Sequence, residues 1–122
     1  MTPSADSDVV LIVEDDEATR DALAEFVGMD GFVAATAPNG VDALEYLRHS
    51  PAPRLIILDL SMPKMDGWQF RAEQSRDSSL ASIPVIVTTA SPSAEASTME
   101  ADAIFFKPLD VHLFLDVISH YH

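Results

Sequence analysis

The chain has no cysteine among its 122 residues, and it has no long hydrophobic run. Without cysteine there can be no disulfide bond, thiolate nucleophile or zinc–thiolate site. No apolar run approaches the roughly 20 residues that a transmembrane helix needs. The first eight residues, MTPSADSD, contain neither a basic segment nor an apolar core, so we expect no signal peptide. These absences predict a cytoplasmic domain that has no membrane partner.

Basic residues are also scarce. The chain has 7 Lys and Arg residues against 20 Asp and Glu residues, which gives a formal net charge of −13. A field of this sign repels phosphate backbones, so we expect no direct binding of nucleic acid. The length predicts one domain with a core of its own. We expect a flexible tail over residues 1–7 and a folded domain over residues 8–122.

The apolar residues alternate between two kinds of pattern along the chain. Continuous aliphatic and β-branched runs predict strands at residues 9–13, 32–37, 55–60, 83–90 and 103–106. Apolar residues at helical spacing predict helices at residues 17–29, after a cap at Asn39, from 66 to about 76, and after a cap at Asp110. In residues 91–102 the only large apolar residue is Met99, so a helix there would be short or irregular. Strands that alternate with helices predict an α/β fold with a parallel sheet covered on both faces.

Polar side chains that could bind a ligand or take part in a reaction stand at the ends of four of the predicted strands. They are Glu14, Asp15 and Asp16 after the first, Asp59 at the end of the third, Thr88 and Thr89 at the end of the fourth, and Lys107 after the fifth. In a parallel α/β sheet the functional crevice lies beyond the carboxyl ends of the strands, so we expect these groups at one edge. Acids packed this closely repel one another, and a hard cation such as Mg²⁺ would remove the conflict. Asp59 could then act as a nucleophile toward phosphorus, with Lys107 and Thr89 binding the phosphoryl oxygens.

Each of these features alone has a simpler explanation. An acidic run after a strand is more often a helix cap than a metal site, and a single Asp after a strand is often the start of a turn. Lys-Pro is a common loop dipeptide, and a Thr at the end of a strand is ordinary. Their joint arrangement at the ends of successive strands is what these simpler explanations leave unexplained.

Four stretches, VLIVEDD, LDLSMPKMDG, PVIVTTA and FFKP, resemble the receiver domain family of response regulators in two-component signalling. The resemblance runs from residue 8 to residue 121. It implies a flavodoxin-like doubly wound sheet of five parallel strands in the order 2-1-3-4-5, with about five helices, the fourth short or irregular. It also implies a single-domain phosphoacceptor, not an enzyme in the usual sense. A sensor histidine kinase or a histidine phosphotransfer protein would supply the phosphoryl group, and an unidentified downstream protein would receive the signal.

The resemblance assigns a role to each residue of the acidic site. Asp59 matches the aspartate that accepts the phosphoryl group. Asp15 would bind Mg²⁺ directly, Glu14 would do so through water, and the backbone carbonyl of Ser61 would complete the protein ligands together with Asp59. Asp16 is expected to be a neighbour of the site, although a shift of one residue in this acidic run remains an alternative.

The resemblance also assigns residues around the phosphoryl group. Thr89 matches the switch hydroxyl and Lys107 the lysine that pairs with the phosphate. In the loop after Asp59, we expect Pro63 to act by its restricted φ and Gly67 by its tolerance of unusual backbone angles.

Two departures from the family pattern concern signal transmission. Thr89 and Lys107 are 107 − 89 = 18 positions apart, about one helical turn fewer than in most receivers. Ile104 also stands where the family usually has a Tyr or Phe. We therefore expect intact phosphorylation chemistry and a switch that differs from the common coupling of a Thr to an aromatic side chain.

Other functions are less consistent with the residues. A haloacid-dehalogenase-type phosphatase needs a second Asp two positions after its nucleophile, where this chain has Ser61. A flavodoxin-like electron carrier needs a Ser/Thr/Gly-rich phosphate loop after the first strand, where this chain has three acidic residues. A receiver that has lost phosphorylation would lack one of the chemical positions, and all are filled here. Because the last predicted helix extends to Tyr121, we expect no effector domain after it.

Overall fold

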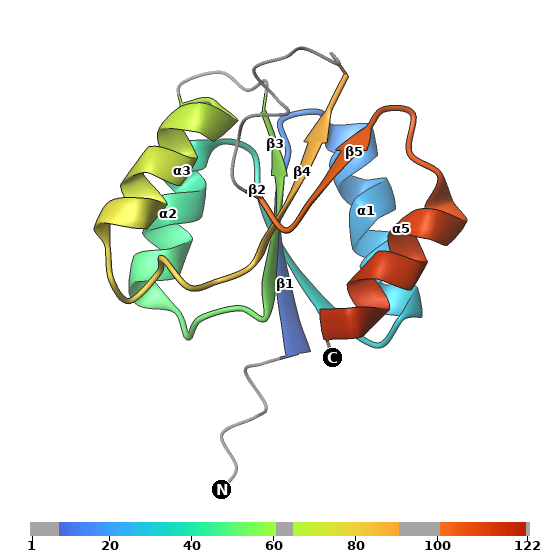
Figure 1. The fold of residues 1–122 in the computed structure, drawn as a ribbon, viewed down its shortest axis with the longest axis horizontal. Helices are drawn as coiled ribbons and strands as arrows, with labels where there is room; N and C mark the ends of the chain where they lie inside the picture. The colour runs from blue at the N-terminus through green and yellow to red at the C-terminus, as the bar shows by residue number, and fades with distance from the viewer. Residues whose placement is uncertain (1–7, 61–64, 91–100, 122) are drawn as a thin grey trace, which may run out of the picture.

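The computed structural model describes residues 8–60, 65–90 and 101–121. Within them, five strands form one parallel sheet in the order β2-β1-β3-β4-β5, which confirms the predicted strand order (Figure 1). The strands are β1 (Val9–Val13), β2 (Val33–Ala37), β3 (Leu55–Asp59), β4 (Val85–Thr89) and β5 (Ala103–Phe106). The expected tail, residues 1–7, lies outside the described residues.

The helices cover both faces of the sheet, as expected for a doubly wound fold. They are α1 (Glu17–Met29), α2 (Gly40–His49), α3 (Gly67–Arg76) and α5 (Val111–Ile118), and α5 is followed by a 3₁₀ turn, η2 (Ser119–Tyr121). Figure 1 shows α2 and α3 on one face and α1 and α5 on the other. Residues 91–100, which contain most of the segment for which we expected a short or irregular helix, lie outside the described residues.

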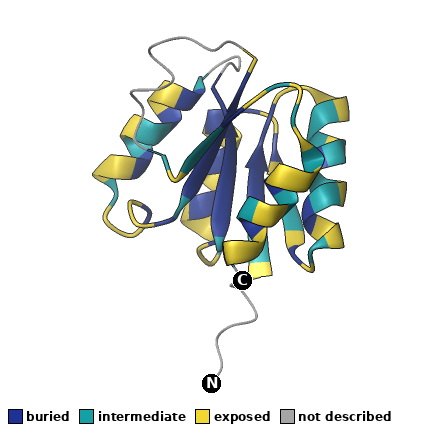
Figure 2. Cartoon of the chain, turned by 45° about the vertical axis from the view of Figure 1, so that its right-hand side comes forward, coloured by how far each residue is buried: buried dark blue, intermediate teal, exposed yellow. Residues whose placement is uncertain are grey.

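The continuous apolar runs form strands because both faces of the sheet are buried. Alternate residues of β1 belong to two separate cores: Leu11 and Val13 pack on the α2 and α3 side, and Val10 and Ile12 pack on the α1 and α5 side. All residues of β3 and β4 are buried. Figure 2 shows this buried sheet between helices whose outer faces are exposed. The edge strand β2 is less buried than the central strands, and Val33 in it is 60% exposed.

Side-chain caps begin the helices that follow the strands. The predicted caps Asn39 and Asp110 are confirmed, since their side chains accept hydrogen bonds from the backbone N–H groups of Asp42 and Leu113. A third cap, Asp66, forms a reciprocal capping box with Gln69 at the start of α3. Among the described residues, no helix combines the length and the apolar character needed to cross a bilayer.

Candidate functional site

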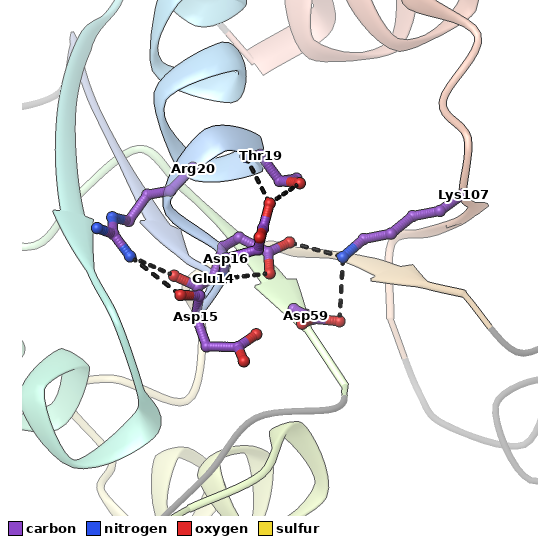
Figure 3. Close-up of polar contacts among 7 residues, drawn as sticks. All are labelled: Glu14, Asp15, Asp16, Thr19, Arg20, Asp59 and Lys107. Atoms are coloured by element: carbon purple, nitrogen blue, oxygen red, sulfur yellow. Dashed lines mark hydrogen bonds and ion pairs between the residues drawn. The ribbon is translucent and has the colours of Figure 1, made fainter.

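Three carboxyl groups meet at the carboxyl-terminal edge of the sheet. Glu14 and Asp15 follow β1, and Asp59 is the last residue of β3. These strands are adjacent and parallel with Val13 opposite Leu58, so their ends are level. One oxygen of each carboxyl group lies within 4.8 Å of the others, with Glu14 and Asp59 buried and Asp15 exposed (Figure 3). A set of carboxylate oxygens at this spacing has the ligand chemistry that Mg²⁺ prefers.

Lys107 contacts this acidic cluster from the end of β5. Its backbone N–H donates to the carbonyl of Thr89 over 2.8 Å, which keeps the residue beside β4. Its Nζ donates to Glu14 Oε1 over 2.7 Å and lies 3.6 Å from Asp59 Oδ1. Burial lowers the pKa of Lys107, but the hydrogen bond to Glu14 and the negative charges of Asp59 and Glu14 outweigh burial and raise it overall. The ammonium group is therefore charged at neutral pH.

Glu14 and Asp15 are held differently. Glu14 is 1% exposed, and its two oxygens are used separately: Oε1 accepts from Lys107, and Oε2 accepts from the backbone N–H of Asp16 over 3.2 Å. Within the described residues, the exposed carboxylate of Asp15 makes no hydrogen bond or ion pair. Hydrogen bonds of its own thus fix the Glu14 side chain, whereas the position of the Asp15 carboxylate depends on the position of the Asp15 backbone.

Asp16 serves the helix that follows it. Its carboxylate accepts from the backbone N–H of Thr19 over 2.9 Å and from the Thr19 hydroxyl over 2.6 Å. These hydrogen bonds, the one from the hydroxyl first, lower the pKa of Asp16. Asp16 therefore caps α1, and it is Glu14 and Asp15 that lie with Asp59.

One residue near the cluster was not predicted from the sequence. Arg20, in α1, donates from Nη1 to the backbone carbonyls of Glu14, over 3.1 Å, and Asp15, over 3.4 Å. A basic residue soon after an acidic run was the available signal, but the spacing alone does not show that its partners are carbonyl groups.

The remaining predicted residues lie on β4, on β5 and, in chain order, shortly after β3. Thr89, which is buried, ends β4 opposite Phe106. Ile104 is partly buried and packs against the core on the α2 and α3 side. Ser61 and Pro63, to which we assigned a metal-binding carbonyl and a loop constraint, lie outside the described residues.

The role predicted for Gly67 is wrong in its physical reason. Among the described glycines only Gly31 has a positive φ, so Gly67 does not need an unusual backbone angle. A Cβ at Gly67 would instead lie 2.7 Å from Leu60 Cα and 2.8 Å from the carbonyl oxygen of Asp59. Its N–H also donates to the carbonyl of Leu60 over 3.0 Å. Glycine is needed because α3 begins directly against the end of β3.

Comparison with known proteins gives consistent results. The family model of the response regulator receiver domain matches residues 10–119. Response regulator Rre1 of Synechocystis sp. is 32% identical over 106 residues, which are 83% of this chain and 46% of that protein. Polar-differentiation response regulator DivK of Brucella anthropi is 28% identical over 116 residues, which are 92% of this chain and 94% of DivK. This chain thus spans less than half of Rre1 and nearly all of DivK.

A solved structure agrees with these matches. The crystal structure of the Mn²⁺-bound form of response regulator Rcp1 superposes with a TM-score of 0.76 at 26% identity, covering 92% of this chain and 89% of that one. In the receiver family, a phosphoryl group is accepted in two-component signalling and Mg²⁺ binds at an acidic pocket. The match over residues 10–119 shows that this chain belongs to the response regulator receiver domain family.

Proposed function

We propose that Asp59 accepts a phosphoryl group from the phosphohistidine of a sensor histidine kinase or of a histidine phosphotransfer protein. The observation that carries this proposal is the position of the Asp59 carboxylate. It is buried at the end of β3, 3.6 Å from the Lys107 ammonium and within 4.8 Å of the carboxylate oxygens of Glu14 and Asp15. A carboxylate in this position can attack phosphorus. The nearby ammonium group can balance part of the negative charge that the phosphoryl group brings.

The acidic cluster fits a Mg²⁺ ion. Asp15 and Asp59 would bind it directly, Glu14 through water, and the carbonyl of Ser61 would add a further oxygen ligand. Three clustered carboxyl groups beside one ammonium group, which contacts Glu14 and Asp59, leave an excess of negative charge. The existence of a Mn²⁺-bound form of Rcp1 supports binding of a divalent cation. When bound, Mg²⁺ supplies positive charge that offsets the repulsion among the acids and the charge on the phosphoryl oxygens.

The residues of this chain divide the work of phosphoryl transfer. An oxygen of Asp59 forms the new bond to phosphorus while the bond from phosphorus to the donor imidazole nitrogen breaks, and the electron pair remains on the imidazole. Lys107 pairs with the phosphoryl oxygens, which replace part of its contact with Asp59. Thr89 donates its hydroxyl to the same group from the end of β4. In this way the domain assists its own phosphorylation and dephosphorylation. The result of phosphorylation is a signalling state of the protein and not a released product.

An apolar hollow beside the site supports docking of a protein donor. It has a volume of about 380 Å³ and borders Lys107. It is lined by Ala18, Thr19, Ala22, Leu23, Phe26, Lys107, Pro108, Leu109 and Val111. A partner helix that packs here would lie next to the phosphoacceptor. Because the donor is a kinase or a phosphotransfer protein of this pathway, we place the domain in the cytoplasm.

Phosphorylation would act as a switch by adding charge beside β4 and β5 and so changing a surface that a downstream protein binds. The usual aromatic position holds Ile104, which packs against the core on the α2 and α3 side. Phe106, two residues later, is 48% exposed. We propose that the output surface of this receiver therefore differs from the common arrangement in which an aromatic ring turns inward.

The test is incubation with Mg²⁺ and acetyl phosphate followed by intact-mass measurement. Wild type should gain one phosphoryl group, and Asp59→Asn should gain none, because the amide is not a nucleophile toward phosphorus. Asp116→Asn, which alters an exposed aspartate on α5, is the matched control and should be phosphorylated like wild type. Wild type that remains unmodified, or Asp59→Asn that is modified equally, would show that Asp59 is not the phosphoacceptor.

A further inference from the structure

Arg20 binds the backbone of the residues that supply two of the three clustered carboxylates. One guanidinium nitrogen donates to the carbonyls of both Glu14 and Asp15. In Figure 3 the guanidinium approaches these carbonyls from the side away from Lys107. Arg20 and Lys107 thus contact the same acidic turn at different points, Lys107 through the Glu14 carboxylate and Arg20 through the main chain.

The Asp15 carboxylate needs such support more than the others do. Glu14 is tied through both of its oxygens, and Asp59 belongs to a buried strand. Asp15 lies in the turn between β1 and α1, is exposed, and has no side-chain hydrogen bond or ion pair within the part of the chain that the structure describes. The position of the Asp15 carboxylate is therefore determined by the position of the Asp15 backbone. The carbonyl group of that backbone accepts a hydrogen bond from Arg20.

We propose that Arg20 is a positioning residue for the cation site. By binding the two carbonyls it holds the backbone of Glu14 and Asp15 so that the Asp15 carboxylate stays within reach of Asp59. This inference rests on the proposed function, since it concerns the affinity of the acidic cluster for Mg²⁺. Residues that orient metal ligands affect metal affinity although they do not touch the ion.

The test measures binding of Mg²⁺ alone to the unphosphorylated protein by calorimetry. Arg20→Gln should weaken Mg²⁺ affinity by about tenfold, the lower end of the range found when groups that orient metal ligands are lost. The matched control is Arg76→Gln, which changes the net charge equally. Arg76 is 75% exposed on α3 and pairs with Glu73 over 2.9 Å, so its loss should leave Mg²⁺ affinity unchanged. Urea unfolding in EDTA establishes that each variant is folded during the titration.

Arg20→Lys separates positioning from charge. It keeps the positive charge but replaces the planar guanidinium with a compact ammonium group that does not reproduce the contact with both carbonyls. We expect Mg²⁺ affinity to fall in this variant too. Full wild-type affinity in Arg20→Lys, or in Arg20→Gln, would overturn the positioning role. If Arg20→Gln does not fold, Arg20→Lys decides alone.

The two proposals fail in different ways. Wild type that takes up no Mg²⁺ would overturn both the metal dependence of the proposed function and the role of Arg20. Wild type that binds Mg²⁺ and is phosphorylated on Asp59, together with Arg20 variants of unchanged affinity, would overturn only the role of Arg20.

Discussion

Neighbouring polar side chains at the ends of the strands have different surroundings. Asp59 is opposite Thr88 in the pairing of β3 with β4, and both residues are buried. Among the described residues, the Thr88 hydroxyl oxygen is the buried side-chain polar atom for which no hydrogen-bond partner is found. The hydroxyl of Thr89, the next residue, is not such an atom. A run of two threonines in the sequence gives no indication of this difference, which depends on where each side chain points.

Thr88→Val should stabilise the protein. A buried hydroxyl without a partner costs roughly 1–3 kcal/mol, and valine has nearly the same shape, so we expect the free energy of unfolding to rise by about 1 kcal/mol. Urea denaturation with an unchanged m-value measures this. Thr89→Val, at the adjacent position, should give no such gain because its hydroxyl is not a buried group that lacks a hydrogen-bond partner. A loss of stability in Thr88→Val would mean that its hydroxyl is hydrogen-bonded in solution.

At the scale of elements, the junction of β3 with α3 determines how closely a helix can approach the phosphoacceptor strand. Gly67 lies against the backbone of Asp59 and Leu60. Gly28, near the end of α1, is exposed and has nothing within 4 Å of the position of a Cβ. The sequence does not distinguish these two glycines, but a Cβ would be crowded at Gly67 and would meet no other atom at Gly28.

Substitution of each glycine by alanine should therefore have opposite effects. Gly67→Ala places a methyl group against backbone atoms that cannot move aside, so we expect a loss of about 1–3 kcal/mol, as for other overpacked sites. Gly28→Ala should be neutral or stabilising by up to about 1 kcal/mol, because alanine is the better helix former. Thermal or urea unfolding of both variants checks this. Equal effects would show that the α3 junction is looser than the structure indicates.

At the scale of the whole molecule, the excess of acidic residues is the dominant electrostatic feature. The formal net charge is −13 and the isoelectric point from the sequence is about 4.3. Like charges repel one another in a compact structure, and dissolved salt screens that repulsion. The acidic cluster at the edge of the sheet is a local part of this general excess.

Added NaCl should therefore raise the melting temperature at neutral pH, measured in EDTA so that divalent cations do not contribute. The control is the same salt series near pH 4.3, where the net charge is close to zero and the gain should disappear. An equal gain at both pH values would attribute the stabilisation to something other than charge repulsion.

Most of the fold could be predicted because its physical causes are local in the sequence. Runs such as residues 9–13 can be satisfied only by burial on both faces of a sheet, and the caps Asn39 and Asp110 have side chains suited to that position. The errors are small shifts at the ends of elements. The fourth strand, expected at residues 83–90, is Val85–Thr89, and the last helix ends at Ile118 before a 3₁₀ turn. Such ends depend on hydrogen bonds that sequence periodicity does not specify.

The amino-acid sequence by itself determined which residue types stand at the ends of the strands, since strand and helix lengths place them there once the sheet is parallel. Only the tertiary structure decided how those residues are used. Asp16 caps α1 while Asp15 lies with Asp59, Arg20 binds main-chain carbonyls, and Gly67 allows α3 to begin against β3. The physical reason is that each of these roles depends on contacts of a few ångströms between groups, and the sequence specifies only the order of the residues.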